Sequence, residues 1–202
     1  MQIRELGIPG ALEFTPLLRP DDRGLFTEWY RFEQLEEHVG HPLSLRQANL
    51  SVSAKGVVRG IHYALVPAGQ AKYITVPRGS VVDFVIDIRV GSPTFGQWES
   101  VVLDDVGRTA LYLAEGLGHA FVSLEDDTTM TYLVSEVFNA DRELGVSPLD
   151  PEIGLVFPPE AGEPRLSPRD VEAPSLAEAA AAGNLPTWDE CQALYASLKS
   201  GG

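Results

Sequence analysis

The run VVDFVIDIRV, residues 81–90, constrains the fold more strongly than any other part of the chain. Its even-numbered positions from Val82 to Ile88 are all apolar, whereas its odd-numbered positions include Asp83, Asp87 and Arg89. Side chains alternate between the two faces of a β-strand, so this pattern predicts a strand with one apolar face and one partly polar face. We therefore expect a sheet whose apolar face packs on a core.

Similar short runs recur along the middle of the chain. They are KYITV, ESVVL, TALYL, HAFVSL and MTYLVSEVF, separated by the turn-forming clusters PRG, GSPTFG, DDVGR, AEGLG and EDD. Short strands at close spacing, from about residue 45 to about residue 135, are typical of an all-β sandwich or barrel.

Helices are predicted only at the flanks of this β core. In residues 31–39 the side chains of Phe32, Leu35 and Val39 share one helical face, and Gly40 follows as a C-terminal cap. Two capping boxes predict short C-terminal helices, the first ending at Gly183; they pair Ser175 with Glu178 and Thr187 with Glu190. We expect a single domain over residues 1–202, with a barrel core at about 45–140 and a proline-rich C-terminal segment with helices at about 141–199.

Charge and cysteine content exclude several classes of function. The formal net charge of -14 argues against nucleic acid or an anionic membrane as a partner, because both bind broad basic surfaces. No apolar run approaches the roughly 18 residues of a membrane span, and the N-terminal residues do not have the pattern of a signal peptide. We therefore expect a cytoplasmic protein. The single cysteine, Cys191, excludes an internal disulfide and a cysteine-rich metal site.

Two of the four histidines are candidates for function. His38 and His41 flank Gly40 at the predicted helix end, where a solvated histidine is common, and we assign them no role. His62 and His119 lie just after glycines inside strand patterns, and such glycines often mark a bulge or a close approach of the backbone to a ligand. For either residue alone, a packed core histidine is the more common explanation.

The stretch VVRGIHYALVPAGQAKY, residues 57–73, places three polar side chains among apolar ones. Arg59 and His62 are an odd number of positions apart, so they would face opposite sides of an unbroken strand unless Gly60 forms a bulge. If they converge, Arg59 can clamp an anion and His62 can accept a proton near neutral pH. Lys72 adds a cation, although a solvated strand lysine is its ordinary explanation.

These residue types suit the removal of a proton next to a carbonyl group. A histidine base, a cation beside the enolate oxygen and a phenol such as Tyr132 would together carry out that chemistry. A tyrosine with its ring in the core is an equally common explanation of Tyr132. We predict no metal, because RGIHYAL supplies one histidine where metal-binding cupins have a His-x-His pair followed by glutamate. The sequence contains no GxSxG, P-loop or GxGxxG motif.

The order and spacing of several longer motifs match one enzyme family. DDRGLFTEWY, QANLSVSAKGVVRGIHY, QAKY, GSVVDFVIDIRVGSPTFGQW, YLAEGLGHAF, TYLVSE and LSPRD together resemble the dTDP-4-dehydrorhamnose 3,5-epimerase family. The resemblance covers nearly the whole chain. It implies an all-β, cupin-like jelly roll with short flanking α-helices, a homodimer, and no metal or organic cofactor. The implied substrate is dTDP-4-keto-6-deoxy-D-glucose or a close analogue.

The resemblance also implies roles for individual residues. His62 matches the catalytic base, oriented by Asp170 of LSPRD, while Tyr132 matches the general acid and Lys72 the cation beside the C4 oxygen. The remaining positions match residues that bind the substrate, with Arg59 and Arg23 holding the diphosphate and Arg23 reaching across a dimer interface. These substrate-binding positions are Arg23, Phe26, Glu28, Gln47, Asn49, Arg59, His119, Phe138, Glu143 and Arg169.

The sequence departs from the family pattern at positions that bear on the reaction outcome. Phe138 stands where the family usually has a tyrosine that stacks on thymine, and Arg169 stands where it usually has lysine. GVSPLDP and GHA also replace commoner stretches. These departures leave open whether C3 alone or both C3 and C5 of the sugar are inverted, since relatives of antibiotic-sugar pathways stop after one centre.

Three other functions remain open from the sequence. The first is a 3,4-ketoisomerase acting on the same nucleotide sugar in a similar barrel. The second is a noncatalytic module that binds nucleotide sugars, which the departure at Phe138 would allow. The third, a metal-dependent cupin oxygenase, is disfavoured by the single histidine of RGIHYAL.

Overall fold

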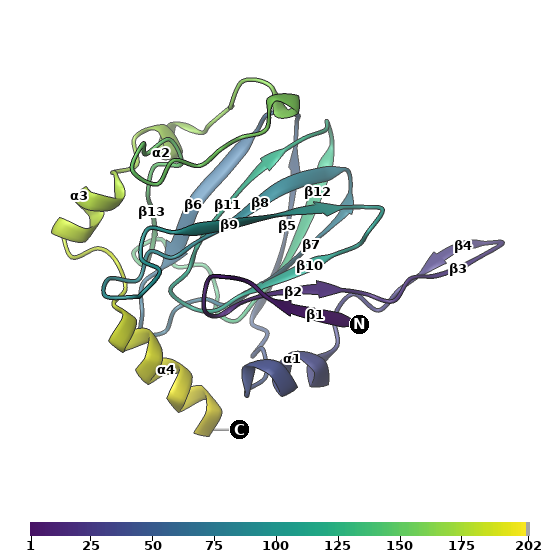
Figure 1. Ribbon diagram of the computed structural model, residues 1–202, viewed down its shortest axis with the longest axis horizontal. Helices are drawn as coiled ribbons and strands as arrows, with labels where there is room; N and C mark the ends of the chain where they lie inside the picture. The colour runs from purple at the N-terminus through teal and green to yellow at the C-terminus, as the bar shows by residue number, and fades with distance from the viewer. Residues whose placement is uncertain (201–202) are drawn as a thin grey trace.

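The computed structural model describes residues 1–200 and contains two antiparallel sheets that face each other (Figure 1). The six-stranded sheet has the order β1 (Gln2–Glu5), β2 (Ala11–Thr15), β10 (Ala110–Leu113), β7 (Lys72–Arg78), β12 (Thr128–Val134) and β5 (Gln47–Ser53). The five-stranded sheet has the order β13 (Glu143–Gly145), β6 (Val58–Ala64), β11 (Gly118–Ser123), β8 (Ser80–Ile86) and β9 (Trp98–Asp104). A hairpin of β3 (Arg19–Asp21) and β4 (Gly24–Phe26) projects away from both sheets.

The predicted all-β, cupin-like architecture is confirmed as a sandwich, and the two sheets do not close into one barrel. The expected start of the β core near residue 45 is wrong, because β1 and β2 belong to the six-stranded sheet. β1 is a short edge strand with the sequence QIRE, whose side chains are mostly exposed, so it carries no apolar alternation. The core also extends past residue 140, since β13 pairs with β6.

Strand β8 has the predicted alternation, but both of its faces are buried. Phe84 and Ile86 pack into a cluster beneath the C-terminal segment, while Val81 and Val85 point into the space between the sheets. Asp83 shares the interior face and is 0% exposed. The sequence predicted that only one face of this strand packs on a core, but both do, because the C-terminal segment covers the outer face of this sheet.

The run 81–90 does not remain extended to its end. Asp87 accepts hydrogen bonds from the Arg89 side chain, from Ser92 and from Thr94, which folds the chain into a turn after Ile86. Arg89 is also 0% exposed and donates to the carbonyl of Pro9. The charges of Asp87 and Arg89 therefore join the sheet to the N-terminal segment and take no part in the site described below.

Helix α1 (Phe32–Val39) covers the outer face of the six-stranded sheet, as the sequence predicts (Figure 1). Gly40 ends it with φ 86°, a left-handed conformation that glycine adopts without steric cost. Leu35 is buried, but Phe32 is 46% exposed and does not share the packed face as expected. His41 is also buried, and its Nδ1 lies 3.1 Å from the carbonyl oxygen of Pro42.

The C-terminal segment covers the outer face of the five-stranded sheet. It contains a 3₁₀ turn (Pro159–Ala161), α2 (Pro168–Val171), α3 (Leu176–Ala181) and α4 (Trp188–Ser200). Both predicted capping boxes are present, with Glu178 and Glu190 bonded back to Ser175 and Thr187. Cys191 is fully buried in α4. Within residues 1–200, no helix combines the length and apolar character that crossing a membrane requires.

Candidate active site

The candidate site lies between the two sheets and draws side chains from both. Lys72 and Tyr132 lie on β7 and β12 of the six-stranded sheet. His62 and His119 pair with each other across β6 and β11 of the five-stranded sheet. The ring of His119 lies 6.2 Å from that of Tyr132 in an edge-to-face arrangement, so polar groups of the two sheets meet across the interior.

A bulge in β6 brings Arg59 and His62 to the same side of the strand. His119 pairs with His62 and Phe121 with Arg59, so three steps along β6 oppose two along β11. Gly60 has φ 132°, and a Cβ atom there would lie 2.4 Å from that of Ala120, so only glycine fits. Arg59 and His62 converge because β6 has the bulge at Gly60 that their odd spacing along the strand requires for it.

His62 is held by Asp170, as expected, although 108 positions separate them. His62 Nε2 lies 2.6 Å from Asp170 Oδ1, while Ser167 Oγ donates to the other carboxylate oxygen at 2.9 Å. Burial of Asp170 alone would raise its pKa, but the hydrogen bonds from His62 and Ser167 lower it overall. An ionised carboxylate can only accept, so Nε2 is the donor, and in the neutral imidazole Nδ1 then has the free lone pair. That lone pair can act as a base.

Lys72 supplies a cation in a partly buried setting. Burial lowers its pKa, and the negative charges of Glu143 and Asp83 oppose this effect. Asp83 accepts a hydrogen bond from His119 Nε2 at 2.8 Å, and its Oδ1 has no hydrogen-bond partner within residues 1–200. Burial raises the pKa of Asp83, while His119 and Lys72 act in the opposite direction. Lys72, Asp83 and His119 thus form one cluster of interacting ionisable side chains.

Tyr132 offers a phenol close to this group. Burial raises its pKa well above the ordinary tyrosine value, so the hydroxyl keeps its proton at neutral pH. Its oxygen lies 3.3 Å from Ser51 Oγ, and this hydrogen bond partly opposes the effect of burial. A neutral phenol with a firmly held proton can serve as a general acid.

Alternate residues of β5 form a polar row at the edge of the site. Gln47 Nε2 donates to Asn49 Oδ1 at 2.6 Å, and Arg59 Nε donates to Ser53 Oγ at 3.2 Å across the gap between the sheets. Ser51 stands between these two pairs and contacts Tyr132. Sequence reasoning missed Ser51 and Ser53, although the period-two pattern QANLSVS indicates a strand with a polar face.

Three further predicted positions lie after β12, namely Phe138, Glu143 of β13 and Arg169 of α2. The backbone N–H of Phe138 donates to Gln47 Oε1 at 3.0 Å, which leaves the Phe138 ring 55% exposed beside the polar row. Glu143 Oε1 accepts from Gln70 Nε2 at 3.4 Å. Arg169 donates to the backbone oxygen of Glu143 at 2.6 Å, so it ties α2 to β13. Phe138 therefore lies near Gln47, and Glu143 lies near Lys72.

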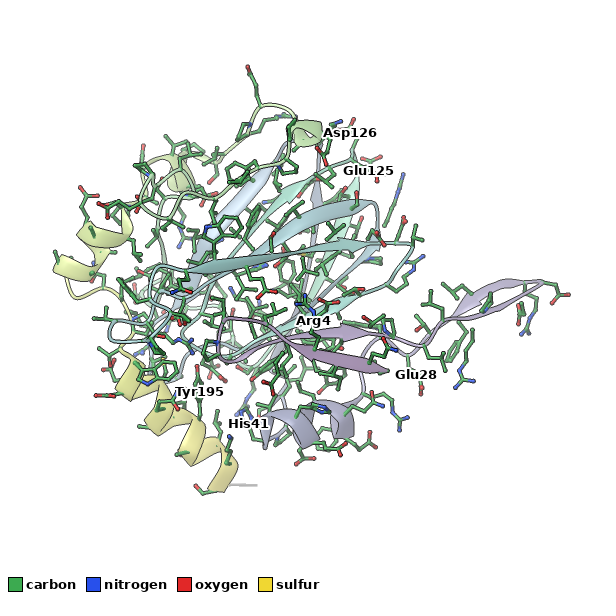
Figure 2. The ribbon with its side chains drawn as sticks, viewed as in Figure 1. Arg4, Glu28, His41, Glu125, Asp126 and Tyr195 are labelled. Carbon is green, nitrogen blue, oxygen red and sulfur yellow. The ribbon has the colours of Figure 1, made fainter. Side chains whose placement is uncertain are left out.

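Three predicted positions do not join the site within one chain. Arg23 lies at the tip of the projecting hairpin, 84% exposed, and pairs with Asp21 at 2.5 Å. Phe26, on β4, is 65% exposed, and Glu28 lies at the base of the hairpin (Figure 2). Within residues 1–200, no cluster of three or more His, Cys, Asp and Glu side chains is arranged to hold a metal ion.

The cupin-like sandwich brings ionisable side chains of both sheets together in its interior, and the comparisons with known proteins place it among sugar-nucleotide isomerases. The family model for dTDP-4-dehydrorhamnose 3,5-epimerase matches residues 5–178. The chain belongs to the dTDP-4-dehydrorhamnose 3,5-epimerase family.

Individual relatives cover nearly the whole chain. A dTDP-4-dehydrorhamnose 3,5-epimerase from Mycolicibacterium smegmatis is 56% identical over 199 residues, 98% of this chain and 98% of that protein. A dTDP-4-dehydrorhamnose 3-epimerase from Streptomyces niveus is 54% identical over 194 residues, 96% of this chain and 93% of that protein. ChmJ, a 3'-monoepimerase from Streptomyces bikiniensis solved in complex with dTDP-quinovose, is 45% identical with a TM-score of 0.94, covering 96% of this chain and 98% of that one.

Proposed function

We propose that the protein inverts C3 of dTDP-4-keto-6-deoxy-D-glucose or a close analogue. The observation that carries this proposal is the 2.6 Å contact between His62 Nε2 and Asp170 Oδ1, which leaves Nδ1 as the ring nitrogen able to accept a proton. His62 pairs with His119, whose ring lies 6.2 Å from that of Tyr132. Relatives named as 3-epimerases and 3,5-epimerases, with more than half of their residues identical to this chain, support the same reading.

The reaction follows from the chemistry of the three side chains. His62 Nδ1 removes the proton from C3, which the neighbouring C4 carbonyl makes acidic. The electrons of the broken C–H bond form the enolate, whose negative charge on the C4 oxygen is stabilised by the Lys72 ammonium. Tyr132 then donates its proton to C3 from the opposite face, and the C4 carbonyl forms again. Asp170 keeps His62 in the tautomer that this step needs.

C5 is a second candidate centre, because it also lies next to the C4 carbonyl. The same base and acid could act there after the sugar ring changes its orientation. The relatives support both outcomes, since one is named as a 3-epimerase and another as a 3,5-epimerase.

The assignment can be tested by proton NMR of dTDP-4-keto-6-deoxy-D-glucose incubated with the enzyme in deuterated buffer. Deuterium at C3 alone is expected of a single-centre epimerase, and deuterium at C3 and C5 of a 3,5-epimerase. A displaced ketone carbon would instead identify a 3,4-ketoisomerase. Saturable binding without exchange at either carbon would identify a noncatalytic module, and both of these results contradict the proposal.

The proposal includes a homodimer in which each hairpin completes the partner's site. The hairpin projects into solvent with Leu25 45% and Phe26 65% exposed, and β5 exposes Leu50 at 66% and Val52 at 53%. A groove of about 470 Å³ separates the hairpin from the sheet and is lined by Leu25, Phe26, Trp29, Thr75 and Thr131. Exposed apolar surface of this kind is typical of an interface.

A dimer would bring Arg23, Phe26 and Glu28 to a second chain, which gives the three isolated positions a role. Arg23 would then join Arg59 in holding the diphosphate, since guanidinium groups bind phosphate oxygens through paired hydrogen bonds. Light scattering should give about twice the chain mass of 21.9 kDa. A particle with the mass of one chain would contradict this part of the proposal.

A further inference from the structure

After one inversion, the protonation states of His62 and Tyr132 are the reverse of those that the next inversion needs. His62 has gained the proton removed from the sugar, and Tyr132 has lost the proton given to it. No net proton is consumed, but the two groups must exchange one before another turnover. The route by which Tyr132 recovers its proton is therefore part of the catalytic cycle.

The buried surroundings of Tyr132 limit how its phenolate can regain a proton. Burial raises the pKa of the phenol, so the phenolate left after proton donation is unfavourable where it forms. Within residues 1–200, Ser51 Oγ is the one hydrogen-bond partner of the phenol oxygen, at 3.3 Å. Distances of this length between catalytic groups often shorten when substrate binds. Ser51 is therefore the protein group placed to hand a proton to the phenolate.

The position of Ser51 suits a relay between Tyr132 and water. It lies on β5, the edge strand of the six-stranded sheet, and its side chain is partly exposed. Its neighbours Leu50 and Val52 are 66% and 53% exposed on the other face of the strand. A serine hydroxyl donates one hydrogen bond while it accepts another, so it can pass one proton on as it takes the next.

We propose that Ser51 relays a proton from solvent to Tyr132 after each inversion. The Ser51 O–H proton moves to the phenolate oxygen of Tyr132, and Ser51 Oγ takes a proton from a neighbouring water in the same step. The hydroxide that remains is neutralised by the proton that the His62 imidazolium releases to solvent. The step returns both residues to their starting state with no net gain or loss of protons.

This inference rests on the proposed epimerase function and also concerns how many centres react. Inversion of a second centre during the same binding event needs a second proton from Tyr132 while the sugar still covers the site. Ser51 would supply it from the edge strand without release of the substrate. Loss of the relay should therefore affect repeated proton donation and leave the first donation intact.

The test compares the first turnover with steady-state turnover in Ser51→Ala. Deuterium incorporation at C3 is followed by rapid quench in deuterated buffer, with enzyme in excess and then with substrate in excess. The first turnover should stay within about 2-fold of wild type, whereas kcat should fall about 100-fold, the lower limit of the range for positioned proton transfer. The progress curve should show a burst of one product per site.

Two further variants separate a relay from a structural role. Ser51→Thr keeps the hydroxyl on a β-branched side chain suited to a strand and should restore kcat to within about 3-fold of wild type. Ser53→Ala removes the partner of Arg59 on the same face of β5, so it should raise KM without producing a burst.

Three results would overturn the relay. The first two concern Ser51→Ala: a first turnover slowed as much as kcat, or a kcat equal to that of wild type. The third is a kcat of Ser51→Thr that stays low while its first turnover is normal. Absence of C3 exchange in the wild-type enzyme is a different result, because it would remove the epimerase assignment and the relay with it.

Discussion

Replacement of His62 with asparagine is expected to reduce kcat by about 10³-fold, within the range for loss of a positioned general base. An asparagine amide can still donate a hydrogen bond to Asp170, so the local structure should be kept. It has no nitrogen lone pair that can accept a proton from C3, so the chemical step should be lost while substrate still binds. KM should therefore change by no more than about 3-fold.

The measurement is the rate of deuterium incorporation at C3, with thermal unfolding of each variant recorded beside it. His38→Asn is the matched control, because His38 lies at the end of α1, bonds to the carbonyl of Gln34 and has no contact with the site. The control should exchange C3 at the wild-type rate. Wild-type turnover in His62→Asn would show that another group removes the proton, and the mechanism proposed here would be wrong.

The parts of the site that follow from local pattern were predictable from sequence. The odd spacing of Arg59 and His62 shows, without knowledge of the fold, that the two can converge only if the strand has a bulge, and Gly60 is the residue that can form it. The contact of His62 with Asp170 could not be predicted in this way, since 108 positions separate the two residues. It was expected from family resemblance alone, and the packing of α2 against the sheet makes it possible.

Other features depend on tertiary contacts that no local pattern contains. Asp83 was read as one polar side chain on a partly polar face, but its role depends on His119 of β11 and Lys72 of the opposite sheet. The hairpin β3–β4 has strands of three residues each, with every residue exposed, so it leaves no apolar alternation to detect. Likewise the proposed role of Ser51 depends on its contact with Tyr132, and the two residues become neighbours only when β5 pairs with β12.

Lys72→Met is expected to reduce kcat by about 10²-fold to 10³-fold, the usual effect of removing one group that stabilises a developing oxyanion. Methionine keeps the length and much of the volume of the lysine stem and removes the ammonium that the proposed mechanism places beside the C4 oxygen. Asp83 then becomes a buried carboxylate with one cation fewer nearby, so its pKa should rise further. C3 exchange at substrate saturation measures the loss, and a kcat within about 3-fold of wild type would contradict the role of Lys72.

The pH profile provides an independent check on Lys72, because the proposed mechanism requires its charged form. Burial lowers its pKa below the ordinary value of 10.5, so kcat of the wild-type enzyme should fall as pH rises through a pKa below that value. Tyr132 should not cause this fall, since burial shifts its pKa in the opposite direction, upward. In Lys72→Arg the cation stays protonated to pH above about 12. Its kcat should be lower than that of wild type because the guanidinium is larger and differently shaped. The alkaline fall should nevertheless be absent from its profile, and a fall at the same pH in both enzymes would assign it to a group other than Lys72.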